Sequence, residues 1–241
     1  MSAPTVPRGT LYLVPNLLGV VPPAAVLPQG TIDIARRLEH YVVETPKAAR
    51  QFLKALHPQR ALQVIDIVPL DGHATYAAVA QMLAPALAGE DIGLMSDAGC
   101  PGVADPGANL VRAAHRADVR VAPLVGPSAV LLALMASGMN GQQFAFHGYL
   151  AVKPDQRTRD IETLDNVCAT SGATQIFIET PYRNAAIFAA TLAACRPTTC
   201  LCVAVDLTLP SEEVRCRSIM DWRRSPAPAL ARRPALFLLG R

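Results

Sequence analysis

Short apolar segments rich in β-branched residues alternate with longer segments of helical spacing in the first half of the chain. This alternation is typical of a largely parallel sheet covered by helices. The pattern therefore predicts an α/β fold. The expected strands are Thr10–Val14, Tyr41–Val43, Ile65–Pro69, Ile92–Met95 and Val119–Val125.

The second half has a different pattern, with fewer helices between its apolar segments. Two helices are expected, around Asp155–Thr170 and Tyr182–Cys195, and two neighbouring strands are expected to form a hairpin, so the sheet should be mixed. A Gly- and Asn-containing stretch places the domain junction near 138–143, giving domains 1–141 and 142–241. The expected strands are Phe144–Tyr149, Gln175–Ile178, Leu201–Asp206, Val214–Ser218 and Ala235–Leu239.

Composition supports a folded, non-membrane protein without a metal. The chain is 51% hydrophobic and 17% charged, which excludes an intrinsically disordered chain. Its net charge of +3 is too small to indicate a nucleic-acid binder by itself. The six cysteines lack zinc spacing, and no secretory leader is visible, so a cytoplasmic protein is expected. The uncharged stretch 121–138 contains two prolines, which favours a strand, a turn and a buried helix over a membrane span.

The most informative segment is a glycine-rich loop between the strand Ile92–Met95 and the next helix. Asp105 and Pro106 suit the N-cap and first position of that helix. The loop, Ser96–Ala104, is longer than most strand-to-helix connections, and its glycines would let a ligand approach the backbone. The loop has neither the GxGxxG order of dinucleotide-binding loops directly after the strand nor the Lys-Ser/Thr pair of phosphate-binding loops. We therefore expect a different ligand there.

Two other strand ends carry polar groups. Glu44 and Glu179 each begin a Glu-Thr-Pro sequence directly after an apolar strand, where open α/β sheets collect ligands. The following Thr-Pro pairs, beginning at Thr45 and Thr180, suit helix N-termini, so a purely structural role is equally compatible with the sequence.

A second turn, 126–129 (GPSA), follows the strand Val119–Val125. It lacks the GxSxG sequence of a nucleophile elbow, which argues against a hydrolase.

Six ordered segments span nearly the whole chain and resemble the tetrapyrrole methylase superfamily of S-adenosylmethionine-dependent methyltransferases. The likeness is greatest to the branch that contains the small-subunit ribosomal RNA ribose methyltransferases and their bacterial relatives. It implies two α/β domains, a homodimer and S-adenosylmethionine bound in a cleft between the domains. The segments are GTLYLVP, SDAGCPGVADPG, VGPSA, FAFHGYL, IETPYR and PALFLLG.

The resemblance also implies site residues, and it requires no metal. For methyl transfer to a ribose hydroxyl, Glu44 and Glu179 are candidate bases, Arg183 is a candidate for positioning substrate or charge, and His73 is a weaker candidate. The implied cofactor-binding residues are Pro15, Ala98, Gly99, Cys100, Val103, Ala104, Ser128, Ala129, Glu179, Leu207 and Ala235.

The substrate stays open because the chain departs from the ribosomal RNA enzymes at three places. Residues 15–20 (PNLLGV) replace PTPIGN, residues 43–47 (VETPK) replace AEDTR, and residues 179–183 (ETPYR) replace ESPHR. Ribosomal or other RNA is the first hypothesis for the acceptor, and a tetrapyrrole-like small molecule is the second. A protein that binds S-adenosylmethionine without catalysis is the third.

Overall fold

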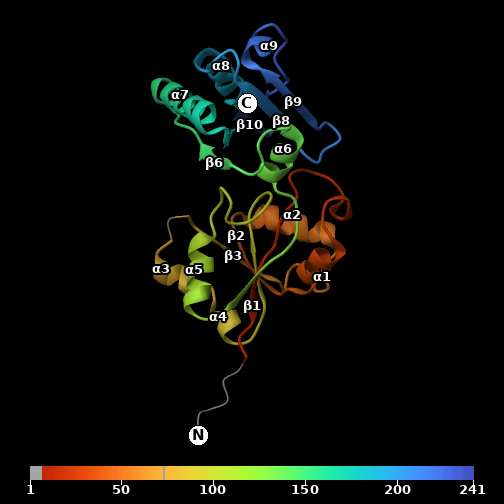
Figure 1. Ribbon diagram of the computed structural model, residues 1–241. Coiled ribbons are helices and arrows are strands. Elements are labelled where there is room, and N and C mark those ends of the chain that lie inside the picture. The colour runs from red at the N-terminus through yellow and green to blue at the C-terminus, as the bar shows by residue number, and fades with distance from the viewer. Residues whose placement is uncertain (1–6, 73) are drawn as a thin grey trace. The chain divides into compact units, whose positions relative to one another are not determined.

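A computed structural model describes residues 7–72 and 74–241, so the candidate His73 lies outside the described residues. The contacts within the chain divide it into two units, one ending at Ser128 and the other beginning at Ala129 (Figure 1). Each unit contains one five-stranded sheet with its own helices. Within the described residues no helix is long and apolar enough to cross a membrane, and no cluster of three or more His, Cys, Asp or Glu side chains could hold a metal ion.

The first unit has the expected parallel sheet, with strand order β3-β2-β4-β1-β5. Its strands are β1 (Thr10–Leu13), β2 (His40–Val43), β3 (Asp66–Pro69), β4 (Ile92–Met95) and β5 (Arg120–Pro123). Its helices are η1 (Pro23–Ala25), α1 (Gln29–Arg37), α2 (Pro46–Leu56), α3 (Tyr76–Gln81), α4 (Ala84–Leu87) and α5 (Ala108–Arg116).

Helices cover both faces of this sheet. Successive residues of a strand therefore pack into two separate hydrophobic cores. Tyr41, Val43 and Met95 pack with residues of α1 and α2. Val42 and Leu94, one position away on the same strands, pack with residues of α3 and α5. This arrangement explains why the strands are apolar throughout rather than alternating.

The second unit has the expected mixed sheet, with strand order β6-β7-β10-β8-β9. Strands β6 and β7 are parallel, β10 is antiparallel to its neighbours β7 and β8, and β8 and β9 form the predicted hairpin. The strands are β6 (Phe144–Tyr149), β7 (Thr174–Ile178), β8 (Cys200–Val205), β9 (Glu213–Ser218) and β10 (Ala235–Gly240). The helices are α6 (Ala129–Ser137), α7 (Pro154–Ser171), α8 (Asn184–Ala194) and α9 (Ile219–Arg223).

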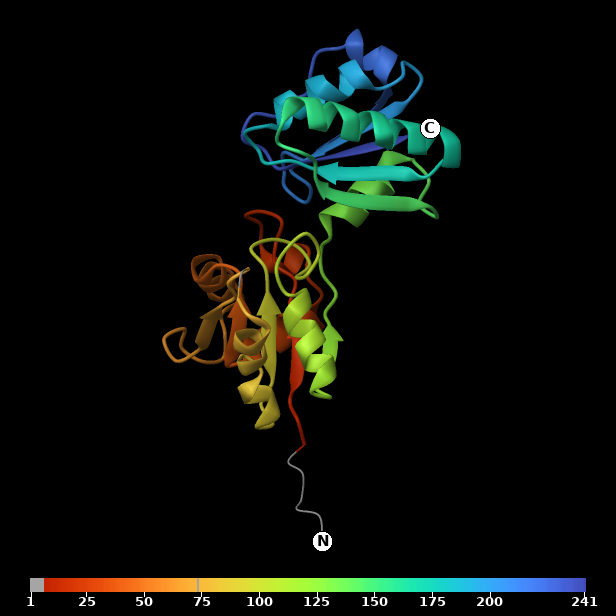
Figure 2. The ribbon, with the colours of Figure 1, turned by 90° about the vertical axis from the view of Figure 1, so that its left-hand side faces the viewer.

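The two faces of the second sheet are covered differently. Helices α7, α8 and α9 pack on one face, around the stacked rings of Phe177 and Phe237, whose centroids lie 5.6 Å apart. Helix α6 packs against β10 and β9 on the other face (Figure 2). The contact boundary before Ala129 thus groups α6 with the second sheet, whereas the sequence pattern suggested a junction after this helix.

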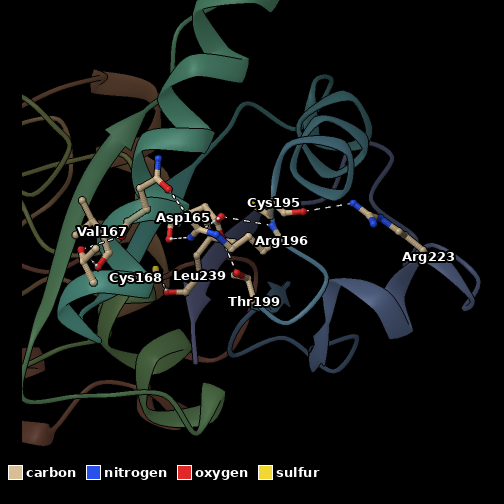
Figure 3. Close-up of polar contacts among 10 residues, drawn as sticks. Asp165, Val167, Cys168, Cys195, Arg196, Thr199, Arg223 and Leu239 are labelled. Atoms are coloured by element: carbon tan, nitrogen blue, oxygen red, sulfur yellow. Dashed lines mark hydrogen bonds and ion pairs between the residues drawn. The ribbon is translucent and has the colours of Figure 1, made fainter.

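A buried carboxylate joins α7 to the turn after α8 (Figure 3). The Asp165 side chain is almost fully buried and accepts hydrogen bonds from the Thr199 hydroxyl and the Arg196 main-chain amide. The Arg196 guanidinium lies 3.1 Å from the same carboxylate. Because the charge is paired and hydrogen-bonded on several sides, its burial is tolerated.

Two predicted helix starts are wrong. Helix α5 begins at Ala108 rather than after Asp105, with Gly107 as its N-cap at a φ of 137°, where a Cβ would lie 2.9 Å from Leu94. Helix α8 begins at Asn184 rather than after Thr180. The Thr180 carbonyl instead accepts a hydrogen bond from the Arg183 amide, which closes a turn ahead of the helix, and the Thr180 amide donates to the adjacent Glu179 carboxylate. In contrast, Thr45 and Pro46 are the N-cap and first residue of α2, as predicted.

Candidate functional site

The loops that follow β1 and β4 are fastened to each other at the carboxyl edge of the first sheet. Asn16 and Gly99 exchange two main-chain hydrogen bonds, of 2.9 and 3.2 Å. The Asn16 side-chain amide also donates to the carbonyls of Ser96 and Asp97, at 3.1 and 2.9 Å. This edge is where parallel sheets bind ligands. Asn16 is a residue that the sequence did not single out as part of the site.

Glu44 connects the end of β2 to the same loop. Its Oε2 accepts a 3.0 Å hydrogen bond from the Asp97 amide, and its own amide donates to the Met95 carbonyl at 3.1 Å. The Thr45 hydroxyl donates to the Asp97 carboxylate at 2.7 Å rather than capping α2. Glu44, one of the predicted catalytic residues, therefore lies at the glycine-rich loop and holds its first residues.

Asp105 is a further candidate site residue beside the glycine-rich loop, and the sequence did not predict this role. Burial raises its pKa from 3.8 to about 6, and the charges of Glu44 and Asp97 act in the same direction. The Ser96 hydroxyl lowers the pKa and so opposes this shift, but among residues 7–72 and 74–241 the buried Ser96 Oγ has no hydrogen bond of ordinary geometry. The sequence had assigned Asp105 to helix capping. Since α5 begins three residues later, its carboxyl group is free for another role.

The backbone of the glycine-rich loop takes conformations that side chains disfavour. Gly99 and Gly102 have φ values of 67° and 80°, and Ala104 has a φ of 65°. A Cβ at Gly102 would meet only open space. Glycine is therefore favoured there by the positive φ and not by a lack of room for a side chain. The predicted loop residues Ala98, Gly99, Cys100, Val103 and Ala104 all belong to this segment between β4 and α5.

The turn after β5 packs against the end of β1. A Cβ on Gly126 would lie 2.3 Å from the Pro15 ring, so only glycine fits at that point. The Cys100 thiol donates to the Pro127 carbonyl at 3.5 Å, which joins this turn to the glycine-rich loop. The structure thus brings the predicted residues Pro15 and Ser128 to the same edge of the sheet as the loop. Ala129 follows as the first residue of α6.

A cavity of about 230 Å³ opens beside these loops, within the first unit. The loop after β1 forms one wall and α2 forms another, while Asp97 and Ala98 close the end nearest β4. Its surface is largely apolar, with Leu17, Leu18 and Phe52 among the lining residues. Such a cavity with a few polar groups at one end is typical of a small-ligand subsite.

The second unit carries its predicted residues along one edge of its own sheet. Ala235 pairs with Val205, close to Leu207, and Leu236 pairs with Ile178, immediately before Glu179. Leu207 and Ala235 are both buried. The structure therefore gathers these three predicted positions where β7 and β8 end and β10 begins.

Glu179 is a fully buried carboxylate with one occupied oxygen. Its Oε1 accepts hydrogen bonds of 2.6 Å from the Thr180 amide and from the Arg183 guanidinium. Its Oε2 and the Arg183 Nε are both buried and have no hydrogen-bond partner among the described residues. Unsatisfied buried polar atoms are costly, so this pair is more than a contribution to stability.

The family model of the tetrapyrrole (corrin/porphyrin) methylases matches residues 28–219, which include Glu44, the glycine-rich loop and the Glu179 turn, whereas β1 and most of the loop after it precede the match. The chain belongs to this family. Its resemblance to the family is thereby confirmed, as is the α/β architecture in two units.

Curated relatives of this methylase are about a third identical to it over the aligned residues and bear the name ribosomal RNA small subunit methyltransferase I. The protein from Xylella fastidiosa is 34% identical over 185 residues, which are 77% of this chain and 62% of the relative. The one from Micromonospora olivasterospora is 35% identical over 209 residues, which are 85% and 61% of the two chains. The chain thus spans about six tenths of the length of the relatives it matches.

Solved structures of other methylases share the fold. The methyltransferase CobJ has a TM-score of 0.63 at 18% identity, with 97% of this chain and 94% of that chain covered. The cobalt precorrin-4 methyltransferase CbiF has a TM-score of 0.59 at 14% identity, with 96% and 94% covered. At these identities the likeness supports the fold and carries no information about the acceptor.

Proposed function

We propose that this methylase transfers a methyl group from S-adenosylmethionine to a ribose hydroxyl of RNA, with ribosomal RNA as the first candidate. Family membership supports the class of reaction, and the names of the relatives support ribosomal RNA as the substrate. The ribose hydroxyl as acceptor group comes from the resemblance to the ribosomal RNA ribose methyltransferases. The observation on which the proposal chiefly depends is the set of interlocked loops at the carboxyl edge of the first sheet. The homodimer and the cytoplasmic location inferred from the sequence stay predictions.

The residues present fit S-adenosylmethionine. The glycine-rich loop offers backbone that a ligand can approach closely, since Gly99 and Gly102 have positive φ and Gly102 has open space beside it. The cofactor-binding role expected of Glu179, in the second unit, stays a prediction. When bound, this cofactor supplies an electrophilic methyl group on a positively charged sulfur.

The protein's own contribution is to orient the reactants and to move one proton. Rigid loops are required, because alignment of two reactants can lower a barrier by about 7 to 11 kcal/mol in favourable cases. The hydrogen bonds of Asn16 and Glu44 to the loop after β4 supply that rigidity. We assign these two residues to positioning.

We assign the acceptance of the hydroxyl proton to Asp105, which lies in the glycine-rich loop ahead of α5. A general base works best when its pKa lies near the working pH, and the pKa of Asp105 is raised to about 6. Glu44 and Asp97 contribute to this shift through their charges. The Glu179 carboxylate is paired with the Arg183 guanidinium, so we do not assign proton transfer to it.

The proposal is tested by incubating the purified protein with methyl-labelled S-adenosylmethionine and with separate RNA, protein and small-molecule fractions of bacterial cells. Label in 16S ribosomal RNA, lost in the Asp105→Asn variant, is the expected result. Label confined to the small-molecule fraction would instead favour a tetrapyrrole-like acceptor. Binding of the cofactor without transfer to any fraction would favour a non-catalytic role.

A further inference from the structure

Two cysteines that no part of the proposed function uses face each other across the β8–β9 hairpin. Cys202 on β8 and Cys216 on β9 are direct partners in the antiparallel register. Directly opposed residues in such a pair have Cα atoms about 4.5 to 5.5 Å apart, which lies within the range that a disulfide bridges. Because side chains of paired residues lie on the same face of the sheet, the two sulfur atoms point to the same side.

The two thiols differ in access to solvent. Cys216 is exposed on β9, the edge strand of the sheet, whereas Cys202 is fully buried on the neighbouring strand. Hydrogen bonding from the Cys202 thiol lowers the pKa of Cys216, and the same interaction together with burial raises the pKa of Cys202. The thiolate of the pair is therefore Cys216, whose sulfur solvent can reach. The thiolate is the reactive form of cysteine.

The neighbouring Cys200 provides a comparison within the same strand. It lies two residues before Cys202, on the same face of β8, but its partner in the register is Ser218. Cys200 therefore shares the strand, the face and the residue type of Cys202 without an opposed sulfur. Burial raises its pKa, so it is also the less reactive thiol.

We propose that Cys202 and Cys216 form a thiol–disulfide exchange site that a low-molecular-weight disulfide, such as oxidised glutathione, closes to an intramolecular disulfide. The Cys216 thiolate attacks the glutathione disulfide, forms a mixed disulfide and releases one glutathione thiolate. The Cys202 sulfur then attacks the Cys216 sulfur and releases the second glutathione, while the Cys202 proton passes to solvent or to a released thiolate. Two protein thiols are oxidised and one glutathione disulfide is reduced to two thiols.

The test is peptide mapping of the full chain after equilibration with oxidised glutathione, followed by alkylation of free thiols and tryptic digestion without reduction. Cleavage after Arg215 and Arg217 separates a Cys216–Arg217 dipeptide, which stays attached to the peptide 184–215 only if Cys216 has formed a disulfide with a cysteine of that peptide. Because this peptide carries Cys195 and Cys200 as well as Cys202, fragmentation of the cross-linked product identifies the partner. The wild-type chain is expected to give this cross-linked product, and Cys200→Ser, the matched control, is expected to give it equally. Cys216→Ser is expected to lose it entirely.

Cys202→Ala distinguishes the two steps, with circular dichroism confirming that the variant folds. It is expected to stop at the mixed disulfide between Cys216 and glutathione, which the wild-type chain does not accumulate. The proposal is overturned if wild-type Cys216 remains unmodified or stays as a mixed disulfide, or if Cys200→Ser removes the cross-link. The last result would identify Cys200 as the partner. Cys216→Ser and Cys200→Ser change residues that are not fully buried, so the test stands even if Cys202→Ala fails to fold.

Discussion

The Asp97 amide donates a 3.0 Å hydrogen bond to the Glu44 carboxylate, which joins the loop after β4 to the end of β2. The two residues are more than fifty positions apart in the chain, yet they lie at neighbouring strand ends because β2 and β4 are adjacent in the sheet. The negative charge that Glu44 brings to this place raises the pKa of Asp105. The site's electrostatics therefore follow from the strand order.

The first prediction concerns the pH dependence of folding stability. The pKa of Asp105 rises from 3.8 to about 6 in the folded protein, so the native state binds more protons than the unfolded state between those values. The contribution of Asp105 to the free energy of unfolding therefore falls as the pH rises through this window. Asp105→Asn should remove this dependence and raise the free energy of unfolding at pH 8 by about 1 to 2 kcal/mol, after allowance for partial exposure.

Urea denaturation of both proteins at pH 4.5 and pH 8 measures this effect. Asp155→Asn is a suitable control, because Asp155 is an exposed carboxylate in the first turn of α7, in the other unit. An Asp105→Asn variant with the same pH dependence as the wild-type chain would contradict the assignment.

The second prediction is that Glu44→Gln lowers the pKa of Asp105. The substitution keeps a side-chain oxygen that can accept the Asp97 amide but removes the charge that raises the Asp105 pKa. Carbon-13 NMR titration of the aspartate carboxyl groups follows the change. Glu162→Gln on α7 should leave the Asp105 titration unaltered, and a Glu44→Gln variant that behaved like this control would show that the two carboxylates do not interact.

The third prediction concerns the buried pair in the second unit. Arg183→Ala leaves the Glu179 carboxylate without its guanidinium partner inside the protein, where an unpaired charge is costly. We expect the free energy of unfolding to fall by about 3 kcal/mol at pH 7. Glu179→Gln combined with Arg183→Ala should recover part of this loss, because no unpaired carboxylate remains. If chemical denaturation showed no recovery in the double variant, the cost would come from lost packing.

The fourth prediction is that Asp165→Ala destabilises the second unit by about 3 kcal/mol or more. The substitution leaves the Thr199 hydroxyl and the Arg196 amide without their acceptor. Thermal unfolding of this variant and of Glu162→Ala, an exposed position on the same helix, measures the difference. Equal unfolding temperatures for the two variants would mean that the network in Figure 3 contributes little.

Most strands could be predicted from the sequence, because the strands of a parallel sheet are buried on both faces and so appear as short apolar segments. The strands β4 and β6 lie where the sequence placed them, and the other strands differ by a few residues at their ends. The observed starts of α5 and α8 could not be predicted, since they depend on a tertiary contact at Gly107 and on the turn between Thr180 and Arg183. Local capping rules do not contain that information.

The candidate site was predictable in part for the same reason. Strand-end residues such as Glu44 and Glu179 are visible in a sequence because they follow apolar segments. Asp105 was missed because its importance arises from burial beside Glu44 and Asp97, which are brought together by the fold. A carboxylate in a long glycine-rich loop, three residues ahead of the helix, is the signal that would have identified it.

The most direct test of the account is isothermal titration calorimetry of S-adenosylmethionine binding to the wild-type chain, Gly99→Val and Gly30→Val. Gly99 has a positive φ and lies against Leu18, whereas Gly30 is exposed with open space around it and serves as the control. We predict that the wild-type chain and Gly30→Val bind the cofactor with equal affinity and that Gly99→Val loses binding while remaining folded. Unchanged affinity in Gly99→Val would contradict the placement of the cofactor at the glycine-rich loop.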